Sequence, residues 1–305
     1  MIARRYLPAM AAALLGGAVA VVVAQNDMSQ VEIKTEKLSD HVWVLHGAGG
    51  NIGLCSGDDG ALLVDDQYAP LSARILAAVK QANDQPLHWV VNTHWHGDHV
   101  GGNENMVAAG ATLIAHDRVR QRMVEGQNNK FFSRKVEPAP ARALPLITFN
   151  DSTTLHVNGE DVTAFHVAPA HTDGDVIVWF PRSNVVHMGD TFFSATYPII
   201  DLESGGSING LIAASERVLK RIGDDTRVIP GHGPTSDKAG LQRYHDMLVG
   251  VRAAVVKLVK QGKTLDQTVA AKPTAAWDET WGKGFMKPDL FTKLIWTELS
   301  AARKP

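Results

Sequence analysis

The sequence is poor in cysteine and carries almost no net charge. Cys55 is the only cysteine in 305 residues, so a disulfide within the chain is excluded. Its alternation with apolar residues in a strand-like run indicates a buried filler rather than a metal ligand. The formal net charge of −2 gives no electrostatic reason to expect a nucleic-acid partner. With 45% hydrophobic residues, the chain can rely on its core, as one large domain or two small ones.

Repeats and low-complexity linkers are also absent, but an apolar run lies at the N-terminus. Arg4 and Arg5 precede the run Leu7–Val23, and small residues offer cleavage sites after Ala20 or Ala24. The run is short for a membrane span of about 20 residues, which favours a cleaved secretory signal over an uncleaved anchor. We expect a periplasmic or secreted protein without stable membrane association. Loss of both arginines would take its net charge from −2 to −4.

The rest of the chain alternates between strand-like and helix-like segments. Apolar runs predict strands at residues 42–45, 52–55, 61–64, 87–92, 112–115, 153–157, 162–167, 176–180, 185–188 and 227–229. Helical spacing of apolar residues predicts helices at 71–83, 100–109, 117–125, 211–222, 239–261 and 290–302, and the polar stretch 126–140 predicts a loop. Strands with helices occur twice in this order, which indicates two sheets packed face to face with helices outside.

The stretch VNTHWHGDHVGGN, residues 91–103, concentrates metal-binding side chains. His94 and His96 alternate along an extended segment, so their rings can point to the same side. Asp98 and His99 follow where the next helix should begin. A helix cap with surface histidines is the alternative, but the spacing HxHxDH is specific enough to favour a metal site.

Three further candidates each follow a predicted strand and stand beside glycine or proline. They are His171 in APAHTDGD, Asp190 in VVHMGDTFF and His232 in RVIPGHGP. Each one alone could be an ordinary loop residue. Their repetition at strand ends indicates that they join the HxHxDH turn, since one turn cannot surround two ions.

The order HxHxDH, then His, Asp and GH, resembles the metallo-β-lactamase superfamily over roughly residues 31–248. The resemblance implies the α/β class, as an αββα four-layer sandwich. The expected organisation is a signal peptide in residues 1–24 and one hydrolase domain, with C-terminal helices, in residues 31–305.

The resemblance also implies two zinc ions per chain. One would be bound by His94, His96 and His171, the second by Asp98, His99 and His232, with Asp190 bridging them. In the segment ALLVDDQ, Asp65 matches a family aspartate that supports the ligands from a strand end, and Asp66 is the alternative.

Imidazole and carboxylate ligands suit zinc chemistry. Two adjacent ions can share a hydroxide near neutral pH, which would attack the carbonyl carbon of an ester, lactone or thioester. Asp98 could also orient this hydroxide and accept its proton. The expected function is therefore that of an exported dinuclear zinc hydrolase with a small-molecule substrate, and the sequence does not define its oligomeric state.

Asp190 bears on the branch of the superfamily. Its β-lactamases usually carry Cys or Ser at this position, whereas glyoxalase II-like thioesterases and lactonases carry Asp. β-Lactam hydrolysis is therefore the alternative rather than the first prediction. His96 argues against the flavodiiron branch, which has HxExDx, and the acidic charge argues against a nuclease. A mononuclear iron persulfide oxygenase, with fewer ligands, and a non-enzymatic metal-binding protein remain further alternatives.

Aromatic residues near the predicted ligands are candidates for a substrate pocket, although such residues often belong to a core. They are Trp95, Phe131, Phe132, Phe192, Phe193 and Tyr197. If several line the mouth of the site, the substrate is partly apolar. Tyr197 stands further after Asp190 than the tyrosine of the superfamily's lactonases, and no basic cluster resembles the glutathione site of glyoxalase II.

Overall fold

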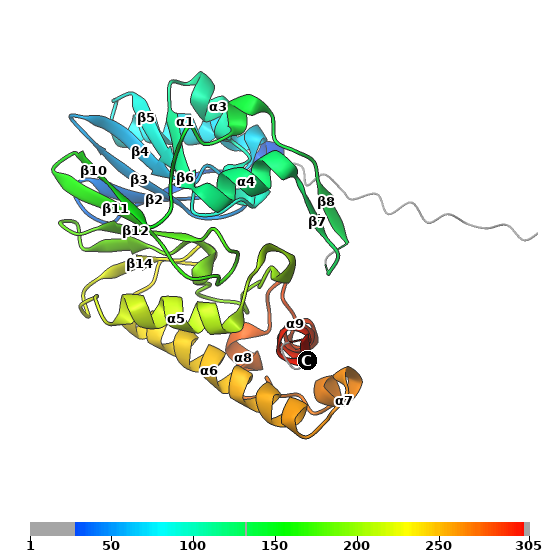
Figure 1. The fold of residues 1–305 in the computed structure, drawn as a ribbon. Coiled ribbons are helices and arrows are strands. Elements are labelled where there is room, and N and C mark those ends of the chain that lie inside the picture. The colour runs from blue at the N-terminus through cyan, green and yellow to red at the C-terminus, as the bar shows by residue number, and fades with distance from the viewer. Residues whose placement is uncertain (1–27, 132, 302–305) are drawn as a thin grey trace, which may run out of the picture.

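The computed structural model describes residues 28–131 and 133–301. The signal peptide expected in residues 1–24 and the pocket candidate Phe132 lie outside this part of the chain. Two β-sheets pack face to face, with helices on their outer faces (Figure 1). The predicted α/β class and αββα layering are therefore confirmed. No helix in the described ranges is both long and apolar enough to cross a membrane.

The first sheet has seven strands and is antiparallel at one end and parallel at the other. Its order is β1 (Lys34–Lys37), β2 (Val42–His46), β3 (Ile52–Gly57), β4 (Gly60–Val64), β5 (Leu87–Val91), β6 (Thr112–His116) and β9 (Ile147–Phe149). Short connections join the antiparallel strands up to β4. The parallel strands that follow need longer crossovers, which helices supply.

The second sheet has five strands. Its order is β10 (Ser152–Val157), β11 (Glu160–His166), β12 (Val176–Phe180), β13 (Val185–His187) and β14 (Arg227–Ile229). Only β13 and β14 are parallel, and the connection between them carries a helix on the outer face. Apolar side chains from both sheets, including Val64, Val91, Val178 and Phe180, form a buried layer between them.

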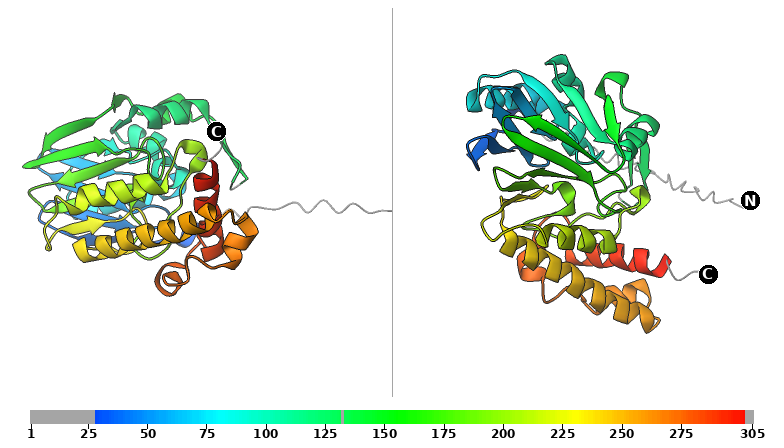
Figure 2. Two further views of the ribbon diagram at one scale, coloured as in Figure 1. Left: turned by 60° about the horizontal axis from the view of Figure 1, so that its bottom comes forward. Right: turned by 60° about the vertical axis from the view of Figure 1, so that its left-hand side comes forward.

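The helices cover the outer faces of the sheets. They are α1 (Ser72–Ala82), α2 (Gly97–Val100), α3 (Asn103–Ala108), α4 (Asp117–Glu125), α5 (Ile208–Leu219), α6 (Lys238–Lys260), α7 (Leu265–Ala270), α8 (Asp278–Trp281) and α9 (Pro288–Ala301). Short 3-10 turns are η1 (Met28–Gln30), η2 (Ala69–Leu71), η3 (Ala141–Ala143), η4 (Gly189–Thr191) and η5 (Leu202–Ser204). Helices α5 and α6 lie side by side over the second sheet, and α7 to α9 pack beyond them (Figure 2).

Two local predictions are wrong. The stretch 126–140 is not a plain loop, because β7 (Gln127–Asn129) and β8 (Arg134–Val136) form a hairpin in it. This hairpin pairs only with itself, so its sequence lacks the apolar alternation of a strand packed on a core. The helix predicted at 100–109 is broken into α2 and α3 at Gly101 and Gly102. A Cβ at Gly102 would lie 2.8 Å from the carbonyl oxygen of Asp66.

Besides β7 and β8, two further strands were not predicted, and both lie at edges of the first sheet. Strand β1 is polar and largely exposed, and β9 has only three residues. Neither carries a strong hydrophobic pattern. The expectation for Cys55 is confirmed, since its thiol is fully buried in β3 and burial raises its pKa to about 12.

Candidate metal centre

The strand ends of both sheets bring all seven predicted ligands together. His94 and His96 lie in the turn after β5, and Asp98 and His99 lie in α2. His171 lies between β11 and β12, Asp190 follows β13 in η4, and His232 follows β14. Donor atoms of one group, His94, His96, His171 and Asp190, lie within 4.8 Å of one another, and those of Asp98, His99 and His232 do the same.

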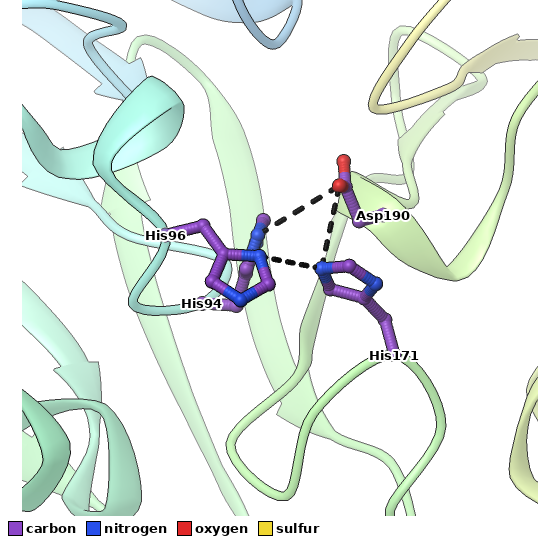
Figure 3. A group of neighbouring side chains, drawn as sticks. All are labelled: His94, His96, His171 and Asp190. Carbon is purple, nitrogen blue, oxygen red and sulfur yellow. Dashed lines mark hydrogen bonds and ion pairs between the residues drawn. The ribbon is translucent and has the colours of Figure 1, made fainter. Parts of the chain in front are cut away.

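The first cluster consists of His94, His96 and His171, with Asp190 at its side. The three rings and the carboxylate point toward a common centre (Figure 3). His96 Nδ1 lies 2.8 Å from His171 Nε2. Asp190 Oδ2 lies 3.4 Å from His171 Nε2 and 3.8 Å from His94 Nε2.

The second cluster consists of Asp98, His99 and His232. His232 Nε2 lies 3.3 Å from Asp98 Oδ2 and 3.4 Å from His99 Nε2. Asp190 Oδ1 lies 3.1 Å from His99 Nε2 and 3.4 Å from His232 Nε2. Asp190 therefore turns one oxygen toward each cluster, which is the arrangement of a bridging ligand.

Hydrogen bonds behind the rings decide which nitrogens face the centre of the first cluster. His171 Nδ1 donates to the carbonyl oxygen of Ile199 at 2.8 Å, and His96 Nε2 donates to Asp201 at 3.0 Å. In the neutral rings, the other nitrogen then carries a lone pair. Two lone pairs only 2.8 Å apart repel each other unless a cation lies between them.

The inward-facing nitrogen of His94 also carries a lone pair, because its other nitrogen donates to Thr93. The hydroxyl of Thr93 donates to Asp65, which leaves its oxygen to accept from His94 Nδ1 at 3.1 Å. His94 Nε2 is then an acceptor, and it is buried without a hydrogen-bond partner among the described residues, as is Asp190 Oδ1. Buried polar atoms are rarely left unsatisfied. These atoms and the histidine and carboxylate donors therefore fit a metal such as zinc.

Asp65 supports the second cluster from the end of β4. Its Oδ2 accepts from His99 Nδ1 at 2.7 Å, and its Oδ1 accepts from the backbone of Thr93 at 2.7 Å. Asp65 adopts a left-handed backbone conformation with φ of 67°, which is unusual for a non-glycine residue. Asp66, the alternative, instead accepts from the backbone of Gly102. The structure thus favours Asp65 as the partner of the ligands.

Asp201, which precedes η5 and holds His96, was not among the predicted site residues. Asp201 also accepts from Ser204 and from Asn129 of the β7–β8 hairpin. His96 and Ser204 hold the pKa of Asp201 at about 2 against the opposing effect of burial. No motif marks this residue, because its role arises from a contact between segments about one hundred residues apart.

The two clusters differ in electrostatics. Burial lowers the pKa of His94, and it lowers that of His171 to about 4, so both rings are neutral. At the second cluster burial also opposes protonation. The negative charges of Asp190 and Asp98 outweigh the effect of burial there. They raise the pKa of His232 to about 9 and that of His99 above its usual range. The second cluster therefore attracts positive charge more strongly.

A cavity of about 480 Å³ opens beside both clusters. Its walls include His96, Asp98, Asp190 and His232, together with the predicted pocket residues Trp95, Phe193 and Tyr197. The ring of Phe193 stacks on that of His232 at 5.1 Å between centroids. An apolar wall therefore reaches a predicted ligand directly.

Two of the predicted pocket residues lie elsewhere. Phe192 is buried against Tyr244 with ring centroids 5.1 Å apart, and it does not line this cavity. The backbone at Phe192 is extended, so consecutive side chains point in opposite directions and only Phe193 faces the cavity. Phe131 packs against the core of the second half and is not part of the cavity wall.

Tyr197 lines the cavity, but its hydroxyl points away from the metal candidates. It donates to Asp278 of α8 at 2.9 Å, and the Tyr197 backbone donates to Trp281 at 2.9 Å. Burial raises the pKa of this phenol above its usual range. The contacts tie the wall of the cavity to the C-terminal helices.

Comparison with known proteins agrees with this geometry. The sequence matches the family model described as metallo-beta-lactamase superfamily over residues 47–236. A type 2 metallo-beta-lactamase of Bacillus cereus is 24% identical over 235 residues, which cover 74% of this chain and 86% of the relative. A hydroxyacylglutathione hydrolase of Nitrosococcus oceani is 27% identical over 251 residues, which cover 80% and 84%.

A solved structure, the metallo-beta-lactamase from Pontibacter korlensis, shares the fold with a TM-score of 0.61 at 21% identity. The match covers 72% of this chain and 99% of that one. The relatives carry different activities in their names, so neither activity transfers on identity alone. The matched family region nevertheless spans more than half of the chain and contains every predicted ligand, and the protein belongs to the metallo-β-lactamase superfamily.

Proposed function

We propose that the protein is an exported dinuclear zinc hydrolase that cleaves a carbonyl bond in an ester, lactone or thioester. The observation that carries this proposal is the position of Asp190, whose two oxygens face two separate ligand clusters. Both clusters border the same cavity, so a substrate there can reach either one.

Zinc held by these residues would supply Lewis acidity and lower the pKa of water. Asp98 is the residue best placed to handle the proton. Its carboxylate lines the cavity and lies 3.3 Å from His232 Nε2. Burial alone would raise its pKa, but His99 and His232 lower it below the usual range, so Asp98 is ionised. It can hold and orient the proton of the attacking water through a hydrogen bond, while its lowered pKa makes it a weak base.

The carboxylate of Asp190 favours an ester or a lactone, rather than a β-lactam, as the substrate. The superfamily's dedicated β-lactamases resemble each other in having Cys or Ser at this place. Here the local backbone is built for a carboxylate. A Cβ on Gly231 would clash with Asp190 Oδ1, so the glycine leaves room for this oxygen between the clusters.

The metal content of the protein as purified and the turnover of one zinc-loaded preparation test the proposal. We expect close to two zinc ions per chain by elemental analysis of protein purified without chelator. We expect lactones or other esters to be hydrolysed better than nitrocefin or a carbapenem. A reproducible single iron would instead favour an oxygenase. A kcat/KM for β-lactams of about 10⁵ M⁻¹s⁻¹, inside the ordinary enzyme range, would establish the β-lactamase alternative.

Export rests on the N-terminal sequence pattern alone. We expect the mature protein to begin near Val21 or Gln25, which N-terminal sequencing of the soluble periplasmic or secreted form would reveal. Recovery only as full-length protein in the membrane fraction would contradict export by cleavage.

A further inference from the structure

We infer that the cavity selects uncharged substrates with an apolar chain, and that Phe285 and Met286 from the C-terminal segment form part of the wall that binds this chain. The inference rests on the proposed hydrolase function and narrows its substrate class. Phe285 and Met286 lie outside the matched family region of residues 47–236.

The wall of the cavity is mainly apolar away from the metal candidates. Its apolar side chains include Trp95, Val136, Phe193, Ile199, Phe285 and Met286. They come from the turn after β5, the β7–β8 hairpin, the segment after η4 and the connection between α8 and α9. A volume of about 480 Å³ is in the range of small-molecule sites, so a chain of several methylene groups fits beside the reacting bond.

Among the side chains that the structure describes, this wall contains no lysine or arginine. Arg122 contacts the lining residue Gln127, but its guanidinium is held by Asp173 through bonds of 2.7 and 2.8 Å. Lys283, near Phe285 in sequence, pairs with Glu279 at 2.9 Å.

A substrate carboxylate remote from the reacting bond would therefore lose water without gaining a cationic partner, which is costly. Glutathione thioesters carry carboxylates several bonds away from the thioester, so this wall does not suit them. A neutral apolar chain, by contrast, gains free energy by leaving water.

The C-terminal part of the wall is held firmly in place. Gly284 packs so closely on Thr196 that a Cβ would clash with its Oγ1. Met286 is buried in the core, whereas Phe285 is 70% exposed at the cavity. Phe285 can therefore be substituted with little effect on folding, which makes it the position to test.

Turnover of matched esters tests the charge selection. We expect 4-nitrophenyl hexanoate to exceed mono-4-nitrophenyl adipate by at least roughly tenfold in kcat/KM, each divided by its hydroxide-catalysed rate. From acetate to hexanoate we expect a rise of up to about fourfold per methylene group. Equal normalised values for the adipate and the hexanoate would overturn the charge selection.

Variants test the wall. Phe285→Ala is expected to lower the hexanoate-to-acetate ratio at least roughly threefold, and Phe285→Lys to shift the preference toward the adipate. Leu146→Ala, at a similarly exposed apolar residue outside the cavity wall, serves as the control and should leave both ratios unchanged. Unchanged ratios in both Phe285 variants would overturn the role of the C-terminal wall.

Calorimetric binding of 2-butanone, 2-hexanone and 2-octanone to the zinc-loaded protein gives a readout that does not require turnover. We expect affinity to rise with chain length, and to rise less in Phe285→Ala. If no ester, lactone or thioester is hydrolysed but this length dependence is present, the hydrolase proposal fails and the apolar site stands. Affinity independent of length would overturn the apolar site even in an active enzyme.

Discussion

The two ligand clusters are built from the same residue types but differ in access. The side chains of His94 and His171 in the first cluster are 1% and 0% exposed. Those of Asp98 and His232 in the second are 23% and 27% exposed and border the cavity. The second cluster is therefore the more open of the two to a substrate, while the first meets the cavity through His96.

The clusters also differ in how their rings are oriented. In the first, ring nitrogens donate to a backbone carbonyl, to the Thr93 hydroxyl and to Asp201. In the second, the buried carboxylate of Asp65 holds His99, and Asp98 adds another negative charge. More anionic ligands bind a cation more strongly but also bind protons more strongly. The comparison thus predicts different responses to mutation and to pH.

Asp190→Ala should have the largest effect and should impair both clusters, because this residue contacts both of them. We expect loss of at least one zinc ion and a fall in kcat/KM of more than roughly 100-fold, beyond the effect typical of outer partners. Elemental analysis and steady-state kinetics measure this. Asp161→Ala, at an exposed carboxylate paired with His156, is the control. Retention of two zinc ions in Asp190→Ala would refute the bridge.

Acidification should separate the clusters. Without metal the pKa of His232 is about 9, so a zinc ion must displace its proton at any lower pH, at a cost of roughly tenfold in affinity per pH unit. The pKa of His171 is about 4, so this ring competes for protons only near or below that pH. From pH 8 to pH 6 we expect at least about a 100-fold loss at the second cluster, since the pKa of His99 is raised as well, and little change at the first.

Competition with a chromophoric chelator at pH 6, 7 and 8 measures both affinities. Parallel weakening of the two ions over this range would mean that the clusters do not differ in proton competition. A single remaining zinc ion at pH 6 would match the expectation.

Asp65→Asn and Asp201→Asn should each weaken a different cluster most, since Asp65 contacts His99 directly and reaches His94 only through Thr93. Outer partners of this kind typically contribute 10–100-fold in metal affinity. We expect Asp65→Asn to lower the zinc affinity of the second cluster by close to 100-fold, the upper end of this range, because Asp65 and His99 are both fully buried. Asp201→Asn should affect the first cluster less, since His96 is partly exposed. Zinc titration of both variants measures the difference, and a reversed assignment of the weakened ion would contradict it.

Tyr197→Phe should have the smallest effect on catalysis. The hydroxyl bonds to Asp278 rather than to a predicted ligand, so we expect kcat/KM to stay within roughly threefold. Loss of this bond should lower the free energy of unfolding by about 1–3 kcal/mol, which thermal or denaturant unfolding measures. A large loss of turnover with unchanged stability would show that the phenol acts on the substrate.

The aromatic residues show how far local pattern reasoning reaches. Trp95, Phe193 and Tyr197 line the cavity as predicted from their position near ligands, but Phe192 belongs to the core. An aromatic pair after a strand contains no signal for which side faces the cavity. Packing of α6 against the second sheet, through Tyr244, decides it.

The sequence by itself determined the layered fold, the superfamily and the local ligand turn, because apolar periodicity and the HxHxDH spacing act within short segments. It also singled out His171, Asp190 and His232 as residues after strands. Only the tertiary structure decided that Asp190 lies between two clusters and that Asp201 holds His96. It alone placed Phe285 at the cavity as well. These contacts join segments far apart in the chain, and their geometry follows from how the two sheets and the C-terminal helices pack.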